Sequence, residues 1–352
     1  MKSPLQTLLD SGTKLWLDTV DLDQVAEARQ LGATGATSNP LIIGELIKSG
    51  RFDDQLATLI EAGHDDEAIA WAVTDRLVSD AEQVFAPVWD QTDGDDGYVS
   101  FELDPLLEDP GCRLDHHQRV ARYIELGQHF ASSHRNRLIK VPATAAGLEA
   151  ARTLAAEGVA LNVTLIFSPR QYRVARDQIF AGRHESHSDN DRYKSVYSIF
   201  VSRLDVYTAD QVPSLSDPAQ GTVGILNAKR IWQENQQFWR DKHFALKQEI
   251  VFASTGTKRP EDPPDKYVAA LAGSDIQTNP PKTLEQVQRL GGRYVRKVDQ
   301  LPAADVIAQI DRQVDMRRLE QVLLAEGVRK FADPHKALLA LISQKRSTLA
   351  AT

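Results

Sequence analysis

Residues 138–167 read LIKVPATAAGLEAARTLAAEGVALNVTLIF and combine three patterns in succession. The segments LIKVPA (138–143) and VALNVTLIF (159–167) are short and mostly aliphatic, which is typical of buried strands. The segment between them, residues 145–158, is rich in alanine and leucine and ends at Gly158, as a helix does. A strand, a helix and a second strand in this order predict a parallel sheet of the α/β class.

The same rhythm continues in both directions along the chain. Six further strand candidates are residues 15–20, 32–38, 98–103, 196–204, 249–255 and 274–280, with helical segments between them. Eight such units predict a closed (β/α)8 TIM-type barrel. An open doubly wound sheet is the alternative, but neither a dinucleotide fingerprint nor a P-loop is present. We expect residues 1–352 to form one barrel domain with a helical extension over about 302–352.

The amino-acid composition and net charge indicate which kinds of binding partner are unsuitable for this chain. The chain has 352 residues, 42% of them hydrophobic, and a formal net charge of −8. These values exclude a disordered chain and argue against nucleic acid or an anionic membrane as the main partner. No apolar run approaches the roughly 18 residues of a membrane helix, and the first residues do not resemble a secretory signal. The single cysteine, Cys112, fits a reducing compartment, so we expect a cytoplasmic protein. We also expect a monomer or a homodimer.

Lys140 is the least expected residue in these strands. It lies between Ile139 and Val141 in a segment that helices should cover on its outer side. Its ammonium group must therefore be buried, reach solvent along its own stem, or take part in chemistry. Burial lowers the pKa of a lysine and makes the amine a nucleophile near neutral pH.

Two carboxylates accompany this lysine at strand ends, where barrel active sites lie: Asp18 and Glu102. An amine and two carboxylates at one barrel mouth suit Schiff-base chemistry, with the amine attacking a carbonyl and the carboxylates moving protons. A structural ion-pair cluster and a helix cap at Asp18 are the alternatives. Other polar residues at strand positions or strand ends are Asn39, Asn162, Thr164, Ser198 and Arg203.

Six segments together resemble the transaldolase family. They are LDTV (17–20), GATSNP (35–40), IKVPAT (139–144), NVTLIFS (162–168), FVSRLD (200–205) and ASTGTK (253–258). They occur in the family's order and at similar spacing, and the resemblance spans about residues 15–345. ASTGTK and TNPPKTLEQV (278–287) are similar to the longer bacterial branch of the family.

This resemblance implies a (β/α)8 barrel that uses no metal and no organic cofactor. It implies transfer of a dihydroxyacetone unit from sedoheptulose 7-phosphate or fructose 6-phosphate to glyceraldehyde 3-phosphate or erythrose 4-phosphate, within the pentose phosphate pathway. Lys140 matches the imine-forming lysine, and Asp18 matches the group that takes the proton of the donor's C4 hydroxyl. Glu102 and Thr164 match the pair that orients a proton-shuttling water. We expect Glu102 to be ionised near neutral pH unless it is strongly desolvated.

The resemblance also assigns substrate contacts. Asn39, Ser198 and Asn162 match residues on the face that holds the donor's hydroxyl end. Arg203 matches a phosphate-binding arginine, and Ser254 matches a phosphate-contacting serine. The segment after Ser254 lacks the arginine of the better-known branch, and Lys258 is the nearby cation.

Two other interpretations stay open. The first is a fructose-6-phosphate aldolase-type lyase, in which a proton replaces the acceptor. The second is a catalytically silent barrel that binds sugar phosphates. A metal-dependent aldolase is disfavoured because His116, His117, His184 and His187 lie in or beside polar segments. The polar residues 183–195 have no counterpart that we could assign.

Overall fold

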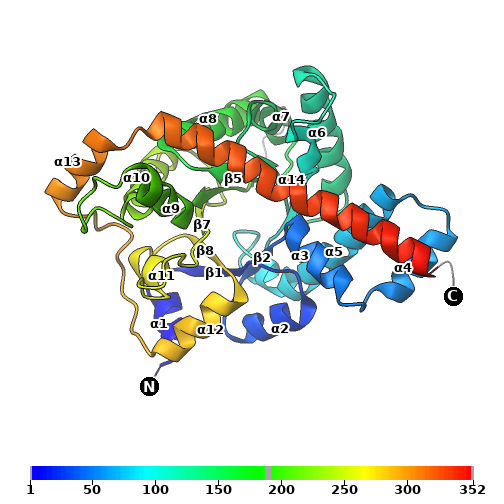
Figure 1. Cartoon of the computed structure of the whole chain (residues 1–352), viewed down its shortest axis with the longest axis horizontal. Helices are drawn as coiled ribbons and strands as arrows, with labels where there is room; N and C mark the ends of the chain where they lie inside the picture. The colour runs from blue at the N-terminus through cyan, green and yellow to red at the C-terminus, as the bar shows by residue number, and fades with distance from the viewer. Residues whose placement is uncertain (1, 187–191, 350–352) are drawn as a thin grey trace.

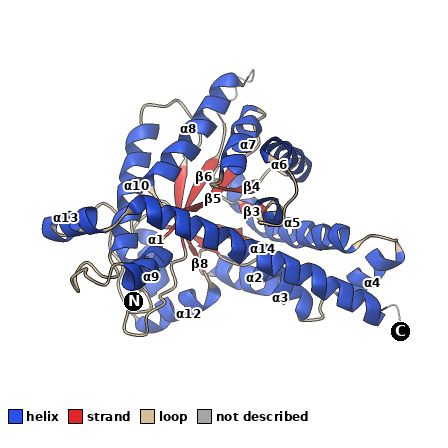
Figure 2. Cartoon of the chain, turned by 45° about the horizontal axis from the view of Figure 1, so that its top comes forward, coloured by secondary structure: helices blue, strands red, loops and turns tan. Residues whose placement is uncertain are grey.

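The computed structural model describes residues 2–186 and 192–349. Its centre is a closed barrel of eight parallel strands in chain order, with helices around it (Figures 1 and 2). The strands are β1 (Lys14–Leu17), β2 (Gly35–Thr37), β3 (Val99–Glu102), β4 (Arg137–Pro142), β5 (Leu161–Ile166), β6 (Ser195–Phe200), β7 (Glu249–Ala253) and β8 (Ile276–Asn279). The (β/α)8 barrel expected from the sequence is therefore confirmed.

Helices follow the strands along the whole chain. They are α1 (Pro4–Asp10), α2 (Leu22–Gln30), α3 (Pro40–Lys48), α4 (Asp53–Glu61), α5 (Asp66–Gln91), the 3-10 helix η1 (Pro105–Glu108), α6 (His116–Ala131), α7 (Ala145–Ala156), α8 (Pro169–Glu185), α9 (Ser202–Gln211), α10 (Val223–Trp239), α11 (Lys266–Ala270), α12 (Pro281–Leu290), α13 (Ala304–Gln313) and α14 (Met316–Leu349). No helix of the described residues is long and apolar enough to cross a membrane.

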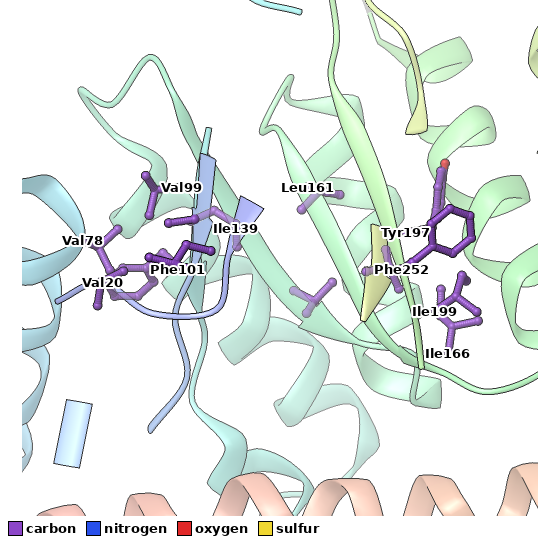
Figure 3. Close-up of a cluster of buried hydrophobic side chains, with 14 of the residues drawn as sticks. Val20, Val78, Val99, Phe101, Ile139, Leu161, Ile166, Tyr197, Ile199 and Phe252 are labelled. Atoms are coloured by element: carbon purple, nitrogen blue, oxygen red, sulfur yellow. The ribbon is translucent and has the colours of Figure 1, made fainter. Parts of the chain in front are cut away.

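Strand residues alternate between the helices and the barrel interior. In β4, Ile139 and Val141 belong to the buried cluster that joins the strands to the surrounding helices. Figure 3 shows Ile139 in that cluster with Phe101 of β3 and Val78 of α5. Because side chains alternate with a period of two, Lys140 must point the other way, into the barrel.

The barrel interior changes from apolar to polar along its axis. A separate buried cluster contains one residue from each of five strands and Tyr98, which precedes β3: Trp16, Tyr98, Leu138, Val196, Val251 and Ile276. In β4 and β6, Lys140 and Ser198 stand two residues beyond members of this layer, toward the carboxyl ends of the strands. The apolar layer therefore forms a floor beneath the polar residues at the barrel mouth.

Helix α14 crosses the barrel mouth, as the orange-to-red helix in Figure 1 shows. It contacts α3, α5, α9, η1 and β5. Gly327 permits the close approach, because a Cβ atom there would lie 2.9 Å from Cδ2 of Leu165. The sequence predicted only a helical extension at this end of the chain and not its position over the barrel.

Most predicted strand boundaries differ from the observed ones by one to three residues, and the largest difference is at the end of β6. The candidate strand 196–204 ends at Phe200, and Ser202 begins α9, so Arg203 lies in the first turn of a helix. Residues 200–204 read FVSRL, and the apolar Phe200 and Val201 extend the strand-like run, but Leu204 is buried when the segment is helical. The expected single-domain organisation stays a prediction.

Candidate active site

Lys140 lies at the centre of the barrel mouth. The register of β3 and β4 pairs Glu102 with Lys140, which brings both side chains to one level of the interior. The Nζ atom of Lys140 lies 2.9 Å from Oε2 of Glu102 and donates a second hydrogen bond to the carbonyl oxygen of Ser38, 3.2 Å away. Both side chains are more than nine-tenths buried. The lysine is therefore held in place by a carboxylate rather than extended into solvent.

Burial has a large effect on Glu102. It raises the pKa of this carboxyl group to about 7, although the charge of Lys140 and its hydrogen bond act in the opposite direction. We expected an ionised carboxylate at neutral pH unless the group is strongly desolvated, and burial in the barrel removes most of its hydration. Glu102 can therefore both give and take a proton near pH 7.

Asp18 follows β1 and faces the same mouth. Its Oδ1 atom accepts a hydrogen bond of 2.9 Å from the hydroxyl group of Thr37 in β2. Burial raises the pKa of Asp18, while the charges of Lys140 and Arg203 and the Thr37 hydrogen bond lower it. Asp18 is thus a second carboxylate within the electrostatic range of the lysine.

A row of hydrogen bonds joins three inward residues of the barrel wall. The hydroxyl group of Ser198 donates to Oδ1 of Asn162 at 2.7 Å, and Nδ2 of Asn162 donates to the hydroxyl oxygen of Ser100 at 2.9 Å. Asn162 also pairs with Lys140 in the β4–β5 register. The row fixes the orientation of the Asn162 amide next to the lysine.

Thr164 lies two residues beyond Asn162 on β5. Its hydroxyl oxygen is buried and has no hydrogen-bond partner among the described residues. The next residue, Leu165, has a φ of 59°, and the β5–β6 register shifts between Val163 and Ile166. An unsatisfied hydroxyl beside strained backbone at a strand end is typical of a functional site.

Asn39 is only half-buried and has a structural task as well. Its Oδ1 atom accepts a hydrogen bond from the backbone N–H of Ile42 and so caps helix α3. The contact of Asn39 with the donor sugar stays a prediction.

The expected phosphate contacts lie together at one side of the mouth. Arg203, Ser254 and Lys258 line a cavity of about 700 Å³ that α14 closes on the other side. One terminal nitrogen of Arg203, Nη1, is buried without a hydrogen-bond partner among the described residues. Ser254 follows β7 with a φ of 56° and lies 2.9 Å, Oγ to Oγ, from Ser202. A cationic cavity beside the lysine suits an anionic substrate.

Comparison with known proteins agrees with this geometry. Residues 15–342 match the family described as transaldolase/fructose-6-phosphate aldolase. The chain is 32% identical to a transaldolase of Thermobifida fusca over 98% of this chain and 99% of the relative. It is also 32% identical to a transaldolase of Mycolicibacterium paratuberculosis, over 95% of each chain. The chain belongs to the transaldolase/fructose-6-phosphate aldolase family. It is an enzyme of this kind.

The family match spans every expected site residue from Asp18 to Lys258. Sequence reasoning nevertheless missed two contacts in this transaldolase-type site. Thr37, the third residue of the GATSNP motif, donates a hydrogen bond to Asp18. Its strand has only three residues, which is too short for the alternation of side chains to show that Thr37 points inward. The ring of Phe331 in α14 lies 5.1 Å from Nζ of Lys140, and no pattern near residue 331 connects it to β4.

The histidines that we disfavoured as metal ligands show no cluster. In residues 2–186 and 192–349, no group of three or more His, Cys, Asp or Glu side chains could hold a metal ion. His116 lies 2.7 Å from a carboxylate oxygen of Glu149, in an exposed pair. His187 lies outside the described residues. The expectation of a reaction without metal stays a prediction.

Proposed function

We propose that this enzyme is a transaldolase that carries a dihydroxyacetone unit on Lys140 as a Schiff base. The observation that supports this most is the buried Lys140–Glu102 pair at the mouth of the barrel, with Asp18 nearby. The proposed donors are sedoheptulose 7-phosphate and fructose 6-phosphate. The proposed acceptors are glyceraldehyde 3-phosphate and erythrose 4-phosphate, in the pentose phosphate pathway of the cytoplasm.

The first step joins enzyme and donor. The neutral amine of Lys140 attacks C2 of the ketose, and a carbinolamine forms. Glu102, with its pKa near 7, gives a proton to the departing hydroxyl group, so that water leaves and an iminium ion remains. The unsatisfied hydroxyl of Thr164 is placed to hold the water through which that proton moves.

The second step breaks the C3–C4 bond. Asp18 takes the proton of the C4 hydroxyl group, the bond electrons move into the iminium ion, and the aldose phosphate leaves. The three-carbon unit stays on Lys140 as an enamine. An acceptor aldehyde then takes the place of the aldose, and the same steps run in reverse. Asn162 and Ser198 are placed to hold the hydroxyl end of the bound unit, and Asn39 can offer its amide N–H.

The pKa of Glu102 keeps the lyase alternative open. A transferase must leave the enamine unprotonated until an acceptor arrives, and an acid with a pKa of about 7 can protonate it below that pH. A lyase would release free dihydroxyacetone. A silent sugar-phosphate-binding barrel gains no support from a buried amine in contact with a proton donor.

Product analysis separates these functions. We expect rapid exchange when fructose 6-phosphate and erythrose 4-phosphate are supplied together, little turnover without the acceptor, and a larger share of free dihydroxyacetone as the pH falls below 7. The Lys140→Ala variant should be inactive and folded. Free dihydroxyacetone as the main product at pH 8, with no gain from added acceptor, would replace the transferase with a lyase. No turnover of either kind by the folded wild type would leave a binding protein.

A further inference from the structure

Helix α14 places one stripe of side chains on the cavity that Arg203 and Lys258 line. The charges of these two residues and of Lys140 all lower the pKa of Asp18, which connects the cavity with the lysine. Four residues at intervals of four, Arg318, Val322, Glu326 and Lys330, line this cavity together with Arg203, Ser254 and Lys258. Residues four apart lie on one face of a helix, so the stripe runs along α14. The neighbouring stripe, Leu319, Leu323, Gly327 and Phe331, is buried against the barrel. The buried stripe fixes which residues the helix turns toward the cavity.

The cavity has more positive than negative groups. Its lining contains four cations, Arg203, Lys258, Arg318 and Lys330, and two carboxylates, Asp210 and Glu326. None of the four cations forms a salt bridge with another described residue, so each can meet an external anion. Burial lowers the pKa of Lys258, and repulsion from the positive charges of Arg203 and Lys330 lowers it further. Lys258, Arg203 and Lys330 are therefore close enough to affect one another's charge.

We propose that Arg318 and Lys330 of α14 bind the phosphate group of the substrate together with Arg203 and Lys258. The inference rests on the proposed function and adds residues that determine specificity for phosphorylated sugars. Cleavage of C3–C4 leaves three carbons on Lys140 and releases the half that bears the phosphate.

The negative charge of Glu326 in the same cavity allows a second test of the opposite sign. Glu326 lines the same cavity, and its charge and that of Asp18 raise the pKa of Arg203, which burial lowers. The same negative charge repels a phosphate group bound in the cavity. Removal of that negative charge should therefore strengthen phosphate binding, whereas removal of either α14 cation should weaken it.

The chain supplies matched controls for both cations. Arg329 and Arg317 are exposed neighbours on α14 that do not line the cavity. Lys330→Met and Arg329→Met each remove one positive charge, as do Arg318→Met and Arg317→Met. A difference within a pair thus reports position and not net charge. All four side chains are exposed, so we expect every variant to fold.

The first measurement is calorimetric titration with inorganic phosphate at low ionic strength, in the Lys140→Ala background, where no reaction occurs. We expect Lys330→Met and Arg318→Met each to weaken binding about tenfold, as loss of one charge-assisted contact does. Arg329→Met and Arg317→Met should stay within about twofold, and Glu326→Gln should bind more tightly. Equal effects within each pair would overturn the proposal, as would weaker binding by Glu326→Gln.

The second measurement compares substrates with active enzyme. The ratio of kcat/KM for fructose 6-phosphate to that for fructose should fall about tenfold in Lys330→Met and Arg318→Met, because fructose has no phosphate group, and should change less than about twofold in the control variants Arg329→Met and Arg317→Met. A loss that is equal for both substrates would show that α14 acts on the reaction and not on the phosphate. Because calorimetry needs no turnover, a failure of the proposed transfer reaction would leave the phosphate result standing, and the reverse also holds.

Discussion

At the scale of single residues, the reaction depends on which of Lys140 and Glu102 carries the proton that they share. Their contact of 2.9 Å lies in a buried environment where both charged forms lose hydration. The amine must give up its proton before it can attack, and the carboxyl group must hold one before it can release water. With a pKa of about 7, Glu102 can accept a proton in one step and donate a proton in another at the same pH.

The substitution Glu102→Gln tests this role. We expect imine formation to slow by roughly 10²–10⁴, the usual contribution of a general acid or base. In the wild type the rate should fall as the pH rises through about 7, because the carboxyl group then loses the proton that it gives to the departing hydroxyl. Stopped-flow measurement across pH should show this step in the wild type only. The same step in Glu102→Gln would assign it to another group.

The substitution Asp18→Asn should separate formation of the imine from cleavage of the C3–C4 bond. An amide keeps the size of the side chain and a partner for Thr37, but it cannot accept the proton of the C4 hydroxyl. We expect imine formation with fructose 6-phosphate to continue while release of the aldose phosphate falls by about 10² or more. Parallel assays of borohydride trapping and aldose release measure both. An equal loss in both assays would place Asp18 in imine formation instead.

At the scale of elements, strands could be predicted better than helix placement. Lys140, Glu102, Asn162, Thr164 and Ser198 stood out because a barrel strand buried on both faces is expected to be apolar. Their inward direction follows from the period of two, and the register of neighbouring strands then brings them together. Periodicity shows that α14 has a buried face but not which distant element covers it, so its contributions could not be predicted.

The opposite end of the barrel contains a buried ionic cluster that fixes strand ends. Nζ of Lys194 lies 2.6 Å from Oε2 of Glu249, and Nζ of Lys14 lies 2.8 Å from the same atom. Burial alone would raise the pKa of Glu249, but the two lysine charges bring it below the ordinary value of 4.5. The pKa of Lys14 is raised above 10.5, because the nearby carboxylates outweigh its burial.

The variant Glu249→Gln should lower the free energy of unfolding at pH 7 by about 3–5 kcal/mol, since it leaves buried lysine charges poorly paired. Glu249 has a lowered pKa when folded, so its contribution is present above pH 4.5 and is lost as the pH falls through the folded value. Urea unfolding at pH 7 and pH 4 measures both statements, with the exposed Glu125→Gln as control. A change no larger than that of the control would contradict them.

At the scale of the whole molecule, the C-terminal helix α14 packs on the barrel and also contributes residues to the candidate active site. Helix α14 contacts α3 and α5 from the first half of the chain and α9 from the second (Figure 2). It also places Phe331 over Lys140 and lines the cationic cavity. We therefore propose that residues 302–352 are part of one domain with the barrel rather than a separable extension.

The central claim is that Lys140 carries the sugar, and trapping with borohydride followed by peptide mapping tests it most directly. Reduction in the presence of fructose 6-phosphate turns the imine into a stable amine and fixes the sugar fragment to the lysine that held it. We predict an adduct on the peptide that contains Lys140, no adduct in Lys140→Ala, and an unchanged yield in Lys336→Met, an exposed lysine of α14. An adduct on any other lysine, or none in the folded wild type, would contradict the account.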